Sequence, residues 1–502
     1  MKRTSAADVA RVAVVAVFAV VTARLLVRSL GWPLVHDAPV MHYIAWRIGE
    51  GAVPYRDLFD MNFPGTYLVH LAVLRVLGTG DAGWRVFDLA WLAAAAALLA
   101  VFARPWGALP AIGAALCFAA YHLAGGSWNA GQRDFLLCPF LIAGAVGVAL
   151  WAERPRATHD ADQRSLQLAG LAVGAGMTIK PHVAGFALGL AVVVVVTAVR
   201  SGGGVATSLA SFLVPIAVAP VAVIVWIASV GGLRAWRDVV VEYLVPLYSR
   251  LGRAEPWTVD RWHLWVPLGG AVAISVVSAV SQRRFTVRHA VAALGVGYGG
   301  FHFLVQGKHW EYHLYPLAAF AALLAFAELD ALARGDVSAR PRRAPAIALG
   351  LVLTALALAL SVKGVDASEA PWARDKVRRA EAVVRDLEPL LGPGDTVQVL
   401  DTTDGGLHTL LRLHVREPTR FLYDFHFFHD TASPVVRALR GELMRDLRAH
   451  PPRAIVVFER GWPRGGYERL DGFPELASFV REAYRPVAGG DGYMVHAQRH
   501  RP

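Results

Sequence analysis

The 502-residue sequence predicts a polytopic α-helical membrane protein with about eleven transmembrane helices and a C-terminal α/β domain outside the membrane. Three observations predict this class. The chain is 55% hydrophobic, and its mean hydropathy of +0.42 is too high for a soluble protein. Apolar segments of about 17–25 residues recur along the first 365 residues. Beyond them the charge content rises, and short strand and helix patterns alternate.

The membrane spans follow from the lengths of the apolar segments. The first covers 8–30, and the absence of a small-residue cleavage site after it argues against a signal peptide. Residues 38–50 then predict a short amphipathic helix on the membrane surface, and 64–78 a re-entrant or interfacial piece. The remaining spans are predicted at 84–103, 108–124, 135–151, 166–180, 183–199, 205–229, 263–281, 288–305, 311–328 and 345–362.

Basic residues predict the orientation. The formal net charge is +11, and in a membrane protein such an excess collects in cytoplasmic loops, so it does not indicate nucleic-acid binding. With a cytoplasmic N-terminus all the basic clusters fall on the inner side, and an odd number of spans places the C-terminus outside. We therefore predict a multi-pass protein of the plasma (inner) membrane with its C-terminal domain extracytoplasmic. The outer loops are then 31–83, 125–134, 231–262 and 306–310.

Two domains are predicted, a transmembrane domain over 1–365 and an extracytoplasmic α/β domain over 366–502. The loop 334–345 reads as a solvated basic linker. In the second domain, helices alternate with buried strands, which predicts a largely parallel sheet. The predicted elements are a helix at 373–391, a strand at 396–400, a helix at 433–450, a strand at 454–458, a helix at 474–484 and a strand at 493–496.

The first outer loop carries the densest set of polar candidates. It places Asp37, Asp57 and Asp60 at the edge of the membrane, together with Tyr55 and Arg56. Charge at that depth costs several kcal/mol unless it is paired or hydrated, so clustered acids there indicate a site. An ordinary polar loop that carries acids is the alternative.

Other outer segments supply cations. A carboxylate can take a proton from an acceptor hydroxyl, and cations can stabilise the charge on a phosphate leaving group. Such a leaving group needs no protonating acid, in contrast to the two carboxylates of glycosidases. This rim therefore suits a lipid phosphate beside a hydroxyl. The candidates are Arg133 with Asp134, Lys180 with His182, the 231–262 loop, and Lys308, His309, Tyr312 and His313.

Each of these groups also has a structural interpretation. Lys180 and His182 can cap helices and extend to the interface. Arg133 and Asp134 can form a local ion pair. The segment 308–313 can belong to an interfacial aromatic belt.

Metal and cofactor binding find little support. The segment 423–430 (YDFHFFHD) could close over a substrate, serve a structural role, or bind a metal through two His and two Asp, but no further ligand spacing supports the metal. Gly405-Gly406 after a strand is too short a motif to predict a phosphate loop. Cys117 and Cys138 both lie in apolar segments, which excludes a disulfide framework. We predict no cofactor and no metal.

A family pattern runs through the first outer loop. Asp37 follows the first span, an amphipathic helix with Tyr43 to Trp46 comes next, and Gly51 to Asp57 reads Gly-x-x-Pro-Tyr-x-Asp. Asp60 precedes a turn that ends at Pro64. The aromatic and basic segment 308–316 and the Pro-Pro pair at 451–452 complete the pattern.

This layout resembles the polytopic GT-C glycosyltransferases. They include the dolichyl-phosphate-mannose–protein mannosyltransferases, the lipid A aminoarabinose transferases and the RgtA/B/C/D-like bacterial enzymes. Two positions depart from the pattern: Asn62 stands where many relatives have Lys, and Ala38 where a second acid commonly follows the first. The missing acid argues against the two-acid, metal-dependent arrangement of protein-glycosylating relatives.

The resemblance implies an inverting hexosyl- or pentosyltransferase. The donor would be a polyprenyl-phosphate-linked sugar, and the acceptor a cell-envelope glycan, lipid or protein on the outer face. Asp37 would be the base, and Asp60 would orient the acceptor or support the base. The donor phosphate would contact Arg133, Lys180, Lys308, His309 and His313, and the acceptor Tyr55, Arg56, Asp57, Asp134 and Tyr312.

Two other classes remain open. A transporter or flippase for lipid-linked sugars would need polar residues at mid-membrane, whereas the interiors of the predicted spans are nearly free of charge. A non-catalytic assembly or sensor protein would use the outer domain for binding and would tolerate loss of Asp37.

Overall fold

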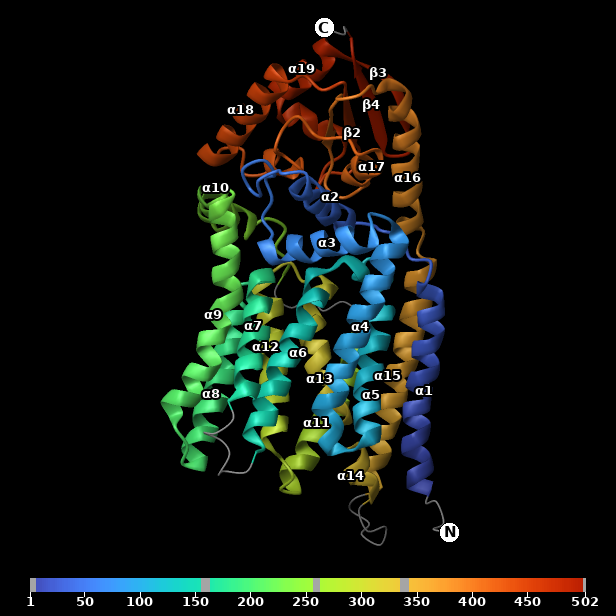
Figure 1. Cartoon of the computed structure of the whole chain (residues 1–502). Coiled ribbons are helices and arrows are strands. Elements are labelled where there is room, and N and C mark those ends of the chain that lie inside the picture. Colours follow the sequence, from blue (N-terminus) through green and yellow to red (C-terminus); the bar gives the residue numbers. More distant parts are fainter. Residues whose placement is uncertain (1–5, 155–162, 256–261, 335–342, 500–502) are drawn as a thin grey trace. The chain divides into compact units, whose positions relative to one another are not determined.

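The structure is a computed structural model that describes residues 6–154, 163–255, 262–334 and 343–499 (Figure 1). Most of the predicted basic linker, residues 335–342, lies outside the described residues. The chain divides into two compact units, which we describe in turn. Unit 1 contains residues 1–32, 85–223 and 254–369; unit 2 contains 33–84, 224–253 and 370–502. The first outer loop therefore groups with the C-terminal residues, and a domain boundary at 365/366 stays a prediction.

Unit 1 is a bundle of long apolar helices, and a helix forms at every predicted span. Within the described residues, eight helices are long and apolar enough to cross a membrane, so the number of spans stays a prediction. The helices that contribute to the bundle are α1 (Ala6–Ser29), α4 (Asp81–Ala103), α5 (Ala108–Leu123), α6 (Arg133–Ala152), α7 (Arg164–Ile179), α8 (Val183–Ser201), α9 (Val205–Ser229), α11 (Trp262–Ser281), α12 (Val287–Gln306), α13 (Tyr315–Phe326), α14 (Leu329–Arg334) and α15 (Arg343–Glu369).

Helix α13 lies at the centre of this bundle, where it packs against α5, α6, α11 and α12 (Figure 1). From Tyr315 to Phe326 all residues but Leu317 are buried, which fits a helix that is apolar on every face. Two glycines of α12 allow its close approach. A Cβ at Gly299 would lie 2.4 Å from Leu317 Cα, and one at Gly295 would lie 2.1 Å from the Phe320 ring. Small residues at such contacts let membrane helices pack closely.

Unit 2 contains a four-stranded mixed sheet with the order β1-β2-β4-β3. Strands β1 (Val397–Leu400) and β2 (Ala454–Phe458) are parallel, as expected for a strand–helix–strand connection. β4 (Tyr493–Gln498) pairs antiparallel with both β2 and β3 (Tyr484–Gly490). The prediction of a largely parallel sheet is thus wrong, because β3 and β4 form a hairpin. β3 was not predicted, since its sequence YRPVAGG combines Pro and Gly with mostly exposed positions.

Helices α16 (Pro371–Leu387), α17 (Gly406–Leu413) and α19 (Pro474–Ala483) pack against this sheet. Helix α2 is buried over residues 38–45 and packs against α3 and α17, so it is not the one-sided amphipathic helix predicted. Helices predicted in the C-terminal region form near the expected residues. The elements are α2 (Asp37–Gly49), α3 (Pro64–Leu77), α10 (Leu233–Asp238), the π-helical segment η4 (Val239–Tyr248), α16 (Pro371–Leu387), α17 (Gly406–Leu413), α18 (Pro434–Ala449) and α19 (Pro474–Ala483).

Candidate functional site

Backbone strain marks several predicted positions. His36, Tyr55 and His309 are among the non-glycine residues with positive φ, at 61°, 67° and 50°. Such conformations cost about 1–3 kcal/mol each and persist where the surroundings hold them. His36 immediately precedes Asp37, Tyr55 is a predicted acceptor contact, and His309 is a predicted phosphate contact. Strain therefore coincides with the predicted site in both units.

In unit 2, Asp37 is the first residue of α2, where the positive end of the helix dipole favours a carboxylate. His36 Nδ1 lies 3.4 Å from Asp37 Oδ1. Burial and the Lys376 ammonium lower the pKa of His36, and the Asp37 carboxylate opposes them. The imidazole beside the Asp37 carboxylate is therefore neutral at pH 7.

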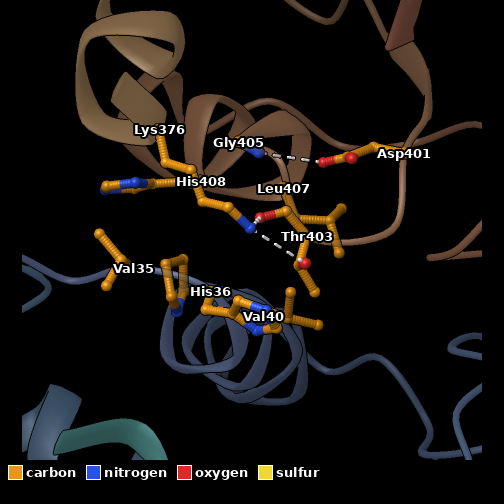
Figure 2. Close-up of a pocket in the computed structure, with 10 residues that line it drawn as sticks. Val35, His36, Val40, Lys376, Asp401, Thr403, Gly405, Leu407 and His408 are labelled. Atoms are coloured by element: carbon orange, nitrogen blue, oxygen red, sulfur yellow. Dashed lines mark hydrogen bonds between the residues drawn. The ribbon is translucent and has the colours of Figure 1, made fainter. Parts of the chain in front are cut away.

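Behind His36 the chain closes a cavity of about 10 Å³, which is too small for more than one water (Figure 2). Lys376 Nζ donates to the Thr403 carbonyl at 2.9 Å and pairs with Asp404 at 3.0 Å. Asp401 accepts the backbone N–H groups of Asp404, Gly405 and Gly406 at the start of α17. Its carboxylate thus occupies the donors that a phosphate loop would offer. The cavity therefore has room for a water molecule but not for a sugar or a phosphate.

Asp60 is buried and held by its neighbours. Its carboxylate accepts the Tyr67 hydroxyl at 2.5 Å and the Asn62 side-chain amide at 2.9 Å. Tyr55 donates its hydroxyl to the Asn62 carbonyl at 2.7 Å. Asn62, which stands where relatives have Lys, therefore fixes Asp60 instead of presenting a cation.

Asp57 and Arg56 form an adjacent ion pair at 2.8 Å. Asp57 also accepts the Val53 N–H at 2.8 Å, and the Arg56 hydrogen bond lowers the pKa of the Asp57 carboxyl. Arg56 is exposed. These contacts define a turn, and an acceptor-binding role for Tyr55, Arg56 and Asp57 stays a prediction.

In unit 1, a buried polar cluster surrounds Asp134. Its carboxylate lies 3.2 Å from Lys180 Nζ and 2.5 Å from His302 Nε2, and it accepts Gln306 Nε2 at 3.0 Å. Lys180 also donates to the Gln306 side chain. The structure therefore pairs Asp134 with Lys180, 46 residues later in the sequence, and not in the local Arg133–Asp134 pair considered above.

Lys308 extends this cluster. It is 8% exposed, and its ammonium lies 5.3 Å from the centre of the Trp310 ring. Burial, followed by repulsion from Arg133 and Lys180, lowers the pKa of Lys308 to about 7. Arg133 and Lys180 thus place positive charge beside the buried Lys308, and Lys180 is also the ion-pair partner of Asp134. A negative charge added among these cations would relieve their repulsion.

The two histidines predicted as phosphate contacts have different surroundings. His313 is buried between Trp310 and Tyr312 and interacts electrostatically with Asp134. His309 stacks on Phe303 with ring centres 4.7 Å apart. Tyr312 packs edge-on against Trp128 at 5.5 Å. His313 thus belongs to the Asp134 cluster, whereas His309 and Tyr312 pack against aromatic rings.

Sequence reasoning missed His302, placed Gln306 only in the outer segment with Lys308, and listed His182 only beside Lys180. His302 Nδ1 lies 2.7 Å from His182 Nε2 and 3.2 Å from the Tyr298 hydroxyl. His302 and Gln306 are four residues apart on α12, so they share one helix face. That spacing of polar residues inside an apolar span was the available signal.

Another buried network involves α4 and α5. Arg85 pairs with Asp88, and Asp88 Oδ2 lies 3.1 Å from His122 Nε2. His122 Nδ1 in turn lies 2.7 Å from the Tyr315 hydroxyl. These two charges of α4 are paired with each other and lie near the start of the helix, outside the span interior.

The segment 423–430 is held by internal contacts of unit 2. Asp424 pairs with Arg469 at 2.7 Å. His426 and His429 converge on the Tyr243 hydroxyl, at 2.7 and 2.8 Å. These contacts correspond to the structural interpretation of the segment.

Solved structures with a similar fold were found over nearly the whole length of the chain. ArnT from Cupriavidus metallidurans bound to undecaprenyl phosphate superposes with a TM-score of 0.63, 15% identity, and coverage of 96% of this chain and 97% of ArnT. The fold is that of the GT-C glycosyltransferases. The archaeal oligosaccharyltransferase AglB from Archaeoglobus fulgidus, in complex with an inhibitory peptide and a dolichol-phosphate, gives a TM-score of 0.51 at 14% identity. It covers 89% of this chain and 69% of AglB. No protein-family model and no curated sequence matches this chain.

The comparison confirms the predicted fold class, a polytopic helical membrane protein of GT-C type with a small C-terminal sheet region. The catalytic and phosphate-binding roles of individual residues stay predictions.

Proposed function

We propose that this protein transfers a sugar from a polyprenyl-phosphate-linked donor to a hydroxyl of a cell-envelope glycan, lipid or protein on the outer face of the plasma membrane. The observation that carries the proposal is the cluster around Asp134 and Lys180, in which the positive charges of Lys180 and Arg133 act on the buried ammonium of Lys308. The GT-C fold, shared with an ArnT structure that holds undecaprenyl phosphate, supports this donor class.

In the donor, the phosphate of the lipid-linked sugar is a diester with one negative charge. When the bond between its oxygen and the anomeric carbon breaks, the leaving polyprenyl phosphate gains a second charge. The cations of the Asp134 cluster stabilise that increase, so the leaving group needs no proton. Asp134 itself holds Lys180 in place and limits the net charge of the empty cluster.

In the acceptor half of the reaction, Asp37 takes the hydroxyl proton while the oxygen attacks the anomeric carbon. One displacement inverts the anomeric configuration. The carboxylate suits this role because it starts α2, lies beside a neutral His36, and is followed by buried Ala38 rather than by a second acid. Asp60, fixed by Tyr67 and Asn62, supports the shape of this segment.

The proposal is tested with purified protein in nanodiscs. A panel of radiolabelled polyprenyl-phosphate sugars is offered with a mixture of membrane-lipid and glycan acceptors. Both transferred sugar and released polyprenyl phosphate are quantified. Stoichiometric formation of the two products with at least one donor supports the transferase. Movement of the intact donor across proteoliposome membranes without any transfer would instead favour the transporter.

A further inference from the structure

Helix α18 separates two cavities of unit 2 that differ in charge. Val435, Ala438, Leu439 and Glu442 face a cavity of about 430 Å³. The opposite face borders a groove of about 500 Å³. We call the second one the α18 groove, and it is lined by Thr431, Arg437, Arg440, Gly441, Met444, Arg445, Arg448, Phe473 and Glu475.

The α18 groove is strongly basic, while its counterpart is acidic. Four arginines of the helix, at 437, 440, 445 and 448, face the groove, and Glu475 is the one acid among its lining residues. The other cavity has Asp238, Glu242 and Glu442 around Arg420. Residues three or four positions apart lie on the same face of a helix, and the arginines of α18 form two pairs with this spacing. They therefore gather on the face that borders the groove, whereas Glu442 lies on the opposite face.

The arginines form an extended row. Arg437 and Arg448 are eleven positions apart, which corresponds to about 16 Å along a helix axis. A single phosphate could contact one or two of these guanidinium groups at a time. The row instead matches a chain that carries an anionic group on successive units.

One guanidinium is fixed in advance. Arg440 Nε and Nη2 both donate to the Phe427 carbonyl, at 2.8 and 2.6 Å, and the group lies 4.5 Å above the centre of the Phe473 ring. Gly441 leaves space at the floor of the α18 groove. The atom nearest to a Cβ added there would be Arg445 Nη1, at a distance of 3.6 Å. Met444 and Phe473 are buried, so the floor is apolar.

We propose that the α18 groove binds an anionic saccharide chain that bears carboxylate or phosphate groups. Guanidinium groups recognise these anions through paired N–H donors, and the apolar floor suits the C–H face of a sugar ring. A hollow with buried Met444 and Phe473 at its base fits a chain better than a flat lipid surface. This site is separate from the residues assigned to transfer, so its occupancy does not depend on the proposed reaction.

The test is calorimetric titration of the full chain in zwitterionic nanodiscs with tetragalacturonate and phosphorylated maltotetraose. Neutral maltotetraose is the matched ligand control. We expect at least one anionic tetrasaccharide to bind with an affinity that falls as NaCl is raised, and maltotetraose to show no heat. Failure of both anionic ligands, or equal binding of inorganic phosphate, would overturn the proposal. Binding to phosphatidylglycerol vesicles in place of the saccharides would do the same.

Variants separate charge from shape. Arg437→Gln/Arg445→Gln removes two exposed guanidinium groups and is expected to weaken binding about tenfold or more. Gly441→Leu keeps every charge but fills the floor, and it should weaken binding as well. The control Arg464→Gln/Arg485→Gln makes the same charge change at exposed positions outside the groove. An equal loss in this control would show that net charge alone attracts the ligand and would overturn the site.

Discussion

Lys308 offers a direct test of the phosphate-binding cluster. Burial and the charges of Arg133 and Lys180 lower its pKa to about 7, from 10.5 in an unperturbed side chain. A bound phosphodiester adds a negative charge and stabilises the ammonium. Binding of the donor should therefore raise the pKa of Lys308 and take up a proton near neutral pH.

The size of the pH effect on donor affinity follows from the linkage between donor binding and protonation of Lys308. If the bound state holds Lys308 protonated up to about pH 9.5, then affinity falls with pH once the free-state pKa is passed. Between pH 6 and pH 8 the expected loss is about tenfold, equivalent to about 1.4 kcal/mol. About half a proton should be taken up per donor bound at pH 7. Donor affinity must fall, not rise, with increasing pH, because Lys308 has the higher proton affinity in the bound state.

The assay uses a polyprenyl phosphodiester, because its single acidic proton is lost well below pH 6 and the ligand itself does not titrate. Titrations at pH 6, 7 and 8 in buffers of different ionisation enthalpy give affinity and proton uptake together. His182, whose pKa burial lowers to about 3, stays neutral throughout. Lys308→Arg keeps the charge at every pH and should remove the pH dependence while preserving affinity. A tenfold slope that survives in Lys308→Arg would refute the assignment of the proton to Lys308.

Three further predictions follow from the same contacts. Asp134→Asn should lower the free energy of unfolding by about 3–5 kcal/mol, because Lys180 loses its buried partner. The double variant Asp134→Asn/Lys180→Met should recover part of this loss in thermal unfolding, and the absence of any recovery would contradict the pairing. Asp60→Asn should cost about 1–3 kcal/mol by disturbing the hydrogen bonds of Tyr67 and Asn62, with exposed Asp491→Asn as the control, and an unchanged midpoint would contradict that role. Burial and Asp404 raise the pKa of Asp401 to about 6, so the folded state binds this proton more tightly than the unfolded state does. The contribution of this carboxyl to the free energy of unfolding should therefore fall as the pH rises from about 4 to about 6. Asp401→Asn keeps a capping oxygen and should flatten that slope; a steeper slope would contradict the assignment.

Hydrophobic pattern was sufficient to predict the helices of unit 1, since each predicted span coincides with one. The strands β1, β2 and β4 were likewise visible as short apolar runs. β3 was not, because Pro486 and its glycines have low strand propensity and the strand depends on its hairpin partner. The direction of pairing, and with it the mixed sheet, is a tertiary property that a strand pattern does not contain.

For the site, residue type and position predicted the members of the Asp134 cluster better than their partners. Arg133, Asp134, Lys180, Lys308 and His313 interact in the structure, as their common predicted side of the membrane suggested. Their partners could not be predicted, because Asp134 contacts His302 and Gln306 from α12, about 170 residues away. Proximity in the sequence alone would have favoured Arg133 as the ion-pair partner of Asp134. The packing of α6 against α7 brings Lys180 to Asp134, and its packing against α12 brings His302 there.

The central claim is that this chain is a transferase with Asp37 as its base. The most direct measurement is single-turnover transfer from an accepted polyprenyl-phosphate sugar, compared among wild type, Asp37→Asn and Asp491→Asn. Asp491 is the control, since its carboxylate is 97% exposed and lies outside the residues assigned to either substrate. We predict a loss of about 10²–10⁴-fold in Asp37→Asn with unchanged donor binding, and a near-normal rate in Asp491→Asn. Full activity in a well-folded Asp37→Asn protein would contradict it.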